Sequence, residues 1–254
     1  MTIYIADTHL LTPLGDNTLK TFYAYQAGCS AYRVANYHTS DHQLVTLSLV
    51  PDGVLPPLAD VIAESEILSS RDERILQMTH FTLGALLSRH SGETIPMILA
   101  GPENYSTLTN QLPPKFLQLL KIQTGFPLHY EVCRTLSMGR AGVLEALKLA
   151  QGYLDSGYCE KIIVGGVDSC QHSEWLAVLD KDGRIKSESE RGNADSFVPG
   201  EGAAFLMLTN NPDLAYEQNG HRFILSAPGL AEEPGHLYSS QPYLGSGLDK
   251  AVKG

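Results

Sequence analysis

Cysteine is scarce in this sequence, and its spacing suits neither a zinc site nor a disulfide frame. The four cysteines, Cys29, Cys133, Cys159 and Cys170, are scattered without a CxxC pair, which is the spacing that many metal and redox sites use. We therefore expect reduced, mostly buried thiols in a cytoplasmic protein. No pattern in the sequence calls for a bound metal or a cofactor.

Long hydrophobic runs and positive charge are also lacking. No apolar stretch approaches the roughly 20 residues that a membrane-spanning helix needs. The strand-like start over Ile3–Ala6 has no basic region before it, so no secretory signal is predicted. The chain has 18 lysines and arginines against 28 acidic residues, a formal net charge of −10. Neither nucleic acid nor an anionic membrane is therefore expected as a partner, because both attract a positive surface.

Strand-like and helix-like segments alternate along the chain, which favours an α/β fold with a mainly parallel central sheet. The expected strands are Ile3–Ala6, Gln43–Val50, Pro96–Ala100, Leu128–Val132, Lys161–Gly166, Ala203–Leu208 and Phe223–Ala227. The expected helices are Thr18–Ala27, Arg71–His90 with Ser70 as N-cap, Pro113–Thr124 and Gly139–Ser156. A polar surface loop is expected over Asp180–Asp195.

The most informative segment lies between the expected strand Leu128–Val132 and the expected helix that starts at Gly139. A strand that passes through a tight turn into a long helix can hold a nucleophile at the helix N-terminus. Unpaired N–H groups and the helix dipole stabilise a thiolate or an oxyanion there. The tip of this turn is Leu136, whose side chain can do no such chemistry. The sequence thus predicts the scaffold of an active site without its nucleophile.

Several segments together resemble the β-ketoacyl synthases, the condensing enzymes with the thiolase fold. The opening motif Leu11–Gly15, the helix and strand over Glu145–Gly166, and the segment His236–Leu248 are similar to that family in order. The run Asp195–Ala204 resembles the family's Asp-Gly-Phe-Val-x-Gly-Glu-Gly-Ala signature, with Ser196 in place of one glycine. Its structural residues would be Phe197, Gly200, Glu201 and Gly202. The resemblance implies a thiolase-like domain over residues 1–254 whose C-terminal half is shortened or absent.

The sequence departs from the family at the catalytic positions. The family's nucleophilic cysteine aligns with Leu136 in the run from Thr135 to Gly139, and leucine cannot attack a thioester. The two histidines that the family's second half supplies have no counterpart, because His221 and His236 precede the point where they would begin. The resemblance therefore implies a chain-length factor, a ketosynthase-like subunit that lacks the cysteine and shapes the acyl tunnel.

This interpretation implies a partner and a set of roles. A full-length ketosynthase would form a heterodimer with this chain and would supply the cysteine, both histidines and most of the docking surface for an acyl carrier protein. An acidic body such as this one is a poor face for an acidic carrier. Leu136 and Met138 would line or close the tunnel. The interface candidates are Leu128, Tyr130, Val132, Cys133 and Arg140.

Two alternatives stay open at this point. A divergent condensing enzyme or acyltransferase could use Ser137 or Cys133, and a shift of one residue in the alignment would put Ser137 in the nucleophile's place. A thiolase-like scaffold without acyl chemistry is the other. The final residues, 247–254, resemble the first turn of an amphipathic helix that then stops. This suggests a cut chain or one that another subunit completes.

Overall fold

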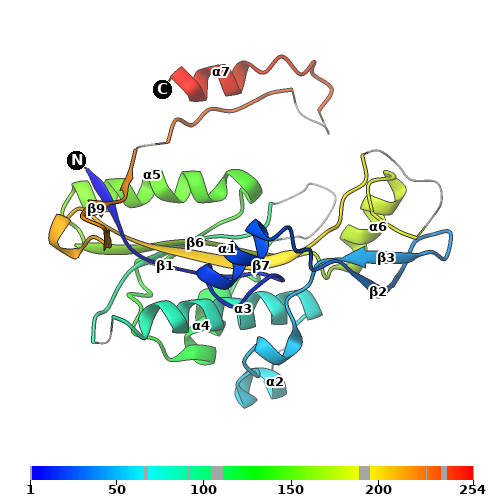
Figure 1. Ribbon diagram of the computed structural model, residues 1–254, viewed down its shortest axis with the longest axis horizontal. Helices are drawn as coiled ribbons and strands as arrows, with labels where there is room; N and C mark the ends of the chain where they lie inside the picture. Colours follow the sequence, from blue (N-terminus) through cyan, green and yellow to red (C-terminus); the bar gives the residue numbers. More distant parts are fainter. Residues whose placement is uncertain are drawn as a thin grey trace.

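A computed structural model describes residues 2–65, 68–90, 92–103, 111–188, 195–226, 228–235 and 239–253 of this chain. Its centre is a six-stranded sheet in the order β10-β1-β7-β6-β4-β5 (Figure 1). The strands are β1 (Ile3–Leu11), β4 (Met97–Ala100), β5 (Arg134–Leu136), β6 (Lys161–Ser169), β7 (Glu201–Thr209) and β10 (Ile224–Leu225). Strands β5, β4 and β6 run parallel, whereas β7, β1 and β10 continue the sheet with antiparallel pairing.

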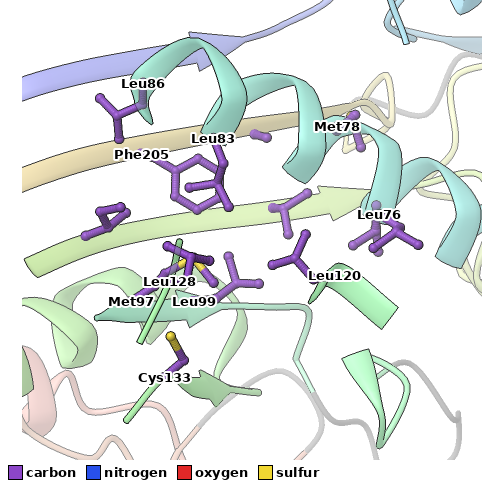
Figure 2. Close-up of a cluster of buried hydrophobic side chains, with 14 of the residues drawn as sticks. Leu76, Met78, Leu83, Leu86, Met97, Leu99, Leu120, Leu128, Cys133 and Phe205 are labelled. Atoms are coloured by element: carbon purple, nitrogen blue, oxygen red, sulfur yellow. The ribbon is translucent and has the colours of Figure 1, made fainter. Parts of the chain in front are cut away.

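Helices cover both faces of this sheet. Helices α3 (Ser70–Leu87) and α4 (Phe116–Thr124) lie on one face, and α5 (Gly142–Asp155) lies on the other (Figure 1). Alternate residues of β4 point to the two sides, as a strand's period of two requires: Leu99 joins the α3–α4 core, and Ile98 joins the α5 core. Figure 2 shows the larger core, in which Cys133 is buried with leucines of α3 and Phe205 of β7.

The remaining elements surround this frame. They are α1 (Thr18–Gln26), β2 (Arg33–His38), β3 (Leu44–Leu47), α2 (Asp60–Ser65), α6 (Ser173–Lys181), β8 (Glu217–Gln218), β9 (His221–Arg222), α7 (Ser246–Lys253) and three short 3₁₀ turns, Asp52–Val54, Gly139–Ala141 and Pro212–Leu214. The β2–β3 hairpin packs on α6 through a third core that contains Leu47 and Leu176. Within the described ranges, no helix is long and apolar enough to cross a membrane.

The predicted strand Leu128–Val132 is wrong. Leu128 makes only an isolated bridge to Ile95, and the next strand starts at Arg134. Local bonds take up the backbone groups instead, since the N–H of Tyr130 donates to the Leu128 carbonyl at 2.9 Å and that of Val132 donates to His129 at 2.9 Å. The apolar side chains are buried without any ladder.

Other boundaries also differ from the predictions. The α3 N-cap is Ser69, whose hydroxyl accepts from the N–H of Asp72, rather than Ser70. The helix expected from Gly139 opens with a 3₁₀ turn, and α5 starts at Gly142. The loop expected from Asp180 starts later, because α6 runs to Lys181. Residues 189–194 of that loop and residues 236–238 of the segment expected to resemble the family lie outside the described residues.

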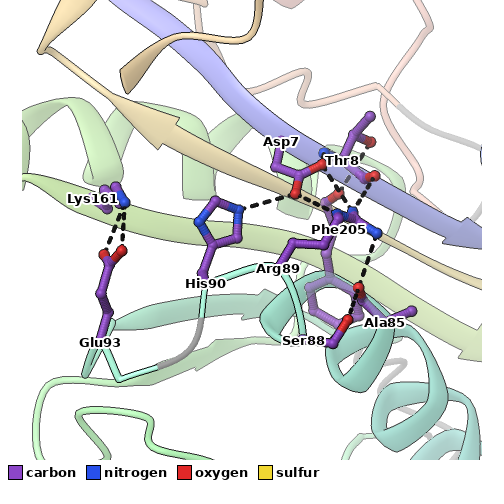
Figure 3. Close-up of polar contacts among 9 residues, drawn as sticks. All are labelled: Asp7, Thr8, Ala85, Ser88, Arg89, His90, Glu93, Lys161 and Phe205. Atoms are coloured by element: carbon purple, nitrogen blue, oxygen red, sulfur yellow. Dashed lines mark hydrogen bonds and ion pairs between the residues drawn. The ribbon is translucent and has the colours of Figure 1, made fainter. Parts of the chain in front are cut away.

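Polar contacts fasten the end of α3 to the sheet (Figure 3). Asp7 of β1 accepts two hydrogen bonds from Arg89, at 2.7 and 2.8 Å, and lies 3.0 Å from the ring of His90. Lys161 of β6 pairs with Glu93 at 2.8 Å. A shift in pairing register between Ile5 and Asp7 sits at the same place. These contacts therefore fix where β1 meets the helix layer.

Two histidines, the buried His9 and the partly buried His80, make the stability of this fold depend on pH. Burial lowers the pKa of His9 and of His80 below the ordinary 6.5. His9 is 7% exposed, and its Nδ1 has no hydrogen-bond partner among the described residues. The unfolded chain then binds protons more readily than the folded chain. Stability is complete above about pH 6.5 and is lost as the pH falls through the folded pKa values.

We expect the urea midpoint of unfolding to be lower at about pH 5.5 than at about pH 7.5. The variant His9→Gln should narrow this difference because it removes one of the two titrating groups. His221→Gln, at an exposed position, serves as the matched control and should leave the difference as it is. An equal midpoint at the two pH values would contradict the buried neutral state of both rings.

Candidate functional site

The strand–turn–helix layout is present between β5 and α5. Strand β5 ends at Leu136, which pairs with Ala100 of β4. Ser137 and Met138 follow, and the turn is made at Gly139, whose φ of +52° is left-handed. This conformation favours glycine. We call residues 136–142 the elbow.

Leu136 turns toward the protein's own core. Its side chain is partly buried and packs on the cluster that contains Ile98 and Ile162. Met138, by contrast, is 49% exposed. Neither residue lines the cavity beside the elbow, and their predicted role in lining or closing a tunnel stays a prediction.

A cavity of about 360 Å³ lies beside the elbow, at the carboxyl ends of β4 and β6. Ligands of open α/β sheets bind at such ends. The walls combine apolar and charged side chains with close-packed backbone. They are Ala100, Gly101, Glu103, Gly139, Arg140, Val143, Gly166, Val167, Asp168, Cys170, Trp175, Phe197 and Gly202.

A buried cation of α3 binds Asp168, a residue of the cavity wall. Arg71 is 2% exposed; its Nη2 donates to Asp168 and its Nε donates to the Ser169 carbonyl, each at 2.9 Å. The Asp168 carboxylate also accepts from the N–H of Ser169 at 2.7 Å. Asp168 is therefore held in place at the end of β6, with its charge balanced from within the fold.

The nearby thiols are in a neutral state. Burial, and then the neighbouring Asp168 carboxylate, raises the pKa of Cys170 to about 11. Cys133 is 3% exposed, and burial raises the pKa of its thiol as well. The thiolate is the nucleophile in cysteine chemistry. Neither cysteine is therefore poised to attack an acyl group.

The motif that begins β7 holds the site together. Glu201 is fully buried and accepts from Arg74 Nε at 2.8 Å, from the Ser169 hydroxyl at 2.7 Å and from the N–H of Val50 at 2.8 Å. Arg74 Nη2 also donates to Glu201. The contacts link α3, the end of β6 and the segment after β3. Glu201 thus works through position rather than as an acid or a base.

The other motif residues pack tightly. Phe197 lies under the Arg184 guanidinium at 5.6 Å and also lines the cavity. A Cβ at Gly200 would lie 3.1 Å from the Ser48 carbonyl oxygen, and one at Gly202 would lie 3.0 Å from that of Leu11. Both glycines therefore allow close approach of neighbouring backbone.

The predicted interface residues do not share one surface. Leu128, Val132 and Cys133 are 5%, 8% and 3% exposed and belong to the chain's own interior. Their side chains cannot contact a partner, and that part of the prediction is corrected. Tyr130 is partly buried beneath Lys121, which lies 5.5 Å from its ring centre. Arg140 is exposed beside the cavity.

Sequence reasoning missed most of the cavity's chemistry. Glu103 follows β4, Asp168 and Cys170 lie at and after the end of β6, and Trp175 belongs to α6. A usable signal was the position of these residues just after buried strands, because the carboxyl ends of parallel strands meet at one edge. The charged partner Arg71 has no such signal.

Comparison with known proteins agrees with this architecture. Residues 139–213 match the family model of the beta-ketoacyl synthase N-terminal domain. The match includes the motif at β7 and begins after Leu136 and Ser137, so it does not align the nucleophile position. No curated protein matches the chain in sequence.

Solved ketosynthases share the fold over nearly the whole chain. The ketosynthase from module 6 of the bacillaene synthase of Bacillus subtilis 168 has a TM-score of 0.66 and 16% identity over 98% of this chain and 47% of its own. The ketosynthase ApeO in complex with its chain length factor ApeC, from Xenorhabdus doucetiae, has a TM-score of 0.67. It is 17% identical over 99% of this chain and 67% of its own. The ishigamide ketosynthase/chain length factor has a TM-score of 0.69 and 14% identity, over 99% of this chain and 68% of its own.

The chain thus has the fold of the solved ketosynthases over nearly its whole length. The predicted resemblance to the β-ketoacyl synthases is confirmed in the fold and in the segment 139–213, which matches the family's N-terminal domain. The chain spans about half the length of the bacillaene ketosynthase, 47%.

Proposed function

We propose that this chain is a non-catalytic, chain-length-factor-like subunit that pairs with a competent ketosynthase in acyl-carrier-linked chain elongation. The observation that carries the proposal is an elbow of the ketosynthase type whose tip, Leu136, packs into the core. The same fold in solved ketosynthases, including ApeO in complex with its chain length factor ApeC and the ishigamide ketosynthase/chain length factor, supports it. The partner would then supply the nucleophile and the histidines.

The alternative with a nucleophile in this chain has less support. Cys133 is buried, with its thiol pKa raised, and the partly buried Ser137 has no base beside it in the described contacts. General-base activation is what makes a serine nucleophilic. The elbow therefore favours a supporting role over acyl transfer.

The β5 edge is the proposed place of contact with the ketosynthase. Strand β5 pairs with β4 on one side and is the last strand of the sheet in the described part of the chain. Arg134 and Thr135 are exposed there, and Met138 lies just beyond the strand. An edge strand offers unpaired backbone groups to another chain. An exposed methionine beside it adds an apolar contact.

The cavity beside the elbow is the proposed place where this subunit limits the acyl chain. Val143, Trp175 and Phe197 provide apolar walls, as a site for an acyl chain requires. The side chains at this cavity, rather than Leu136, would set how far a growing chain extends. In a reconstituted complex, Val143→Phe should shorten the products, whereas Val61→Phe, at an exposed position on α2, should leave their length unchanged.

The chain carries a net negative charge, but one part of it is locally positive. Between positions 111 and 140 the chain has four cations, Lys115, Lys121, Arg134 and Arg140, and one acidic residue, Glu131. Lys115, Lys121, Glu131 and Thr135 line a second cavity of about 410 Å³, which places α4 beside the β5 edge. An acidic carrier that docks mainly on the ketosynthase could therefore also contact this chain.

We expect the double variant Lys115→Glu, Lys121→Glu to slow association of a carrier protein with the heterodimer by about tenfold at low salt, since electrostatic complementarity acts mainly on the association rate. The difference should shrink as salt is added. Lys148→Glu, at an exposed position on α5, is the control and should change the rate little. Stopped-flow measurement at two salt concentrations checks both. An unchanged rate in the double variant would place carrier docking wholly on the partner.

The proposal is tested by reconstitution with a ketosynthase from the same cells. Condensation by that ketosynthase should require this chain, and the intact heterodimer should retain activity when the chain carries both Ser137→Ala and Cys133→Ala. Because Cys133 is in the core, Cys133→Ser and a check of the unfolding midpoint accompany the alanine variant. Loss of activity with Ser137→Ala alone, in a folded complex, would support the acyltransferase alternative.

A further inference from the structure

A further cavity, of about 510 Å³, lies between the start of α3 and the segment that leads into α4. We call it the α3–α4 cavity. It shares no wall residue with the cavity beside the elbow. Its apolar wall consists of Leu68, Leu112, Pro113, Pro114 and Leu119, and its polar wall includes Arg71, Lys115 and His172. The cavity therefore has the size and the mixed lining of a site for a small molecule that is apolar except at one end.

Arg71 is the buried polar side chain of this cavity, with 2% of its surface exposed. Its Nε and Nη2 donate to the Ser169 carbonyl and to Asp168, and neither of these residues lines the α3–α4 cavity. Its Nη1 donates no hydrogen bond within the described part of the chain. A buried donor without an acceptor is costly. Nη1, with its two N–H groups, is thus the nitrogen that Arg71 has left for a ligand in this cavity.

The charges around the cavity are nearly balanced, so hydrogen-bond donors rather than net charge select the ligand. Asp168 balances the charge of Arg71 from outside the cavity. Within the wall, Lys115 is opposed by Asp72, whose carboxylate accepts from the Ser69 hydroxyl at 2.7 Å. A ligand oxygen that accepts from Arg71 is therefore favoured whether it belongs to a carboxylate or to a neutral carbonyl.

Two helices that begin at this cavity favour such an oxygen as well. Helix α4 starts directly after Lys115, which makes no side-chain capping hydrogen bond. Helix α6 starts after its N-cap His172, whose Nδ1 accepts from the N–H of Trp175 at 3.3 Å. In the neutral ring the hydrogen is then on Nε2, which makes His172 a second donor. The N-terminal ends of helices carry partial positive charge, so an electron-rich oxygen is stabilised between them.

We propose that the α3–α4 cavity is a binding site for a small apolar molecule that ends in an oxygen acceptor, a carboxylate or a neutral carbonyl, and that Arg71 Nη1 donates to this oxygen. The site is separate from the cavity to which the acyl chain was assigned above. All its groups belong to this chain, so the inference does not depend on a ketosynthase partner.

Three probes of equal chain length test the site on the full chain. Hexanoate and hexanamide each offer an oxygen acceptor, whereas the ammonium group of hexylamine offers none. Dissociation constants are measured by NMR titration near neutral pH. At least one of the two acceptor probes should bind at least about tenfold more tightly than hexylamine. Tighter binding of hexanoate would identify a carboxylate as the end group of the ligand, and equal or tighter binding of hexanamide would identify a neutral carbonyl.

Arg71→Lys should weaken binding of the tighter acceptor probe at least about tenfold, because lysine has a single nitrogen and Asp168 would take it. Arg222→Lys, at an exposed position on β9, is the matched control and should leave binding unchanged. Since Arg71 is buried, its variant is accompanied by the unfolding midpoint. Leu68→Trp fills the cavity from a partly buried position; it leaves Arg71 in place and should abolish binding.

The proposal is overturned if neither acceptor probe binds the wild type, or if neither is preferred over hexylamine. It is also overturned if binding is unchanged in a folded Arg71→Lys or Leu68→Trp chain. Binding that depends on Arg71 in a chain that forms no complex with a ketosynthase would leave this inference standing and reject the proposed function.

Discussion

Replacing Glu201 with alanine will lower the free energy of unfolding by about 3–5 kcal/mol, because it leaves a buried guanidinium without its carboxylate. The Arg74 side chain is 10% exposed and that of Glu201 is fully buried. Arg74 would keep its bonds to Asp52 and to the Val50 carbonyl, both at 2.6 Å. Those bonds do not replace the buried negative charge of Glu201, because the Asp52 side chain is 92% exposed. Urea unfolding followed by circular dichroism measures the change.

The control for this prediction is an exposed ion pair. Glu217 lies 3.3 Å from Arg222, and both side chains are well exposed, so Glu217→Ala should change the free energy of unfolding by less than about 1 kcal/mol. The account of the β7 motif fails if Glu201→Ala is as mild as this control. In that case the motif would have to be explained by a direct role in the chemistry of the complex.

The second large effect concerns the contact with the ketosynthase. Met138→Asp should weaken the heterodimer by at least about 2 kcal/mol, roughly 30-fold in the dissociation constant, if Met138 is at the centre of the contact. The side chain is 49% exposed and belongs to none of the three cores. The stability of the isolated chain should therefore stay nearly the same.

Val61→Asp is the matched variant for this experiment. Val61 is 63% exposed on α2, on the α3–α4 side of the sheet and away from α5 (Figure 1). Binding titrations with the purified ketosynthase should detect no effect of Val61→Asp. A similar loss in both variants would indicate a general loss of solubility, and no loss in Met138→Asp would move the contact away from the β5 edge.

The sequence predicted the frame of this fold well where periodicity is strong. Strands β4, β6 and β7 are apolar runs between turn residues, and α3 has apolar residues at helical spacing, so local pattern and tertiary burial agree. The run Leu128–Val132 failed because short apolar runs do not distinguish a strand from any other buried segment. Helix α6 was not predicted, and its last two residues, Asp180 and Lys181, fall in the expected loop, although Leu176 and Leu179 are buried.

The candidate site was predictable only in part. Leu136 follows from a local motif, since the turn between a strand and a helix can be recognised in one stretch of sequence. The cavity is built from four separate stretches of the chain, 100–103, 139–143, 166–175 and 197–202, and the pairing of Arg71 with Asp168 joins residues 97 positions apart. Such juxtapositions depend on the order of strands in the sheet.

The central claim is that this chain works as the partner of a catalytic ketosynthase. The most direct measurement is the native mass of the intact protein isolated from its own cells under gentle conditions. The account predicts a one-to-one complex with a chain of ketosynthase size. A lone monomer or a homodimer would contradict it, and Ser137 would then be the first residue to test for acyl transfer.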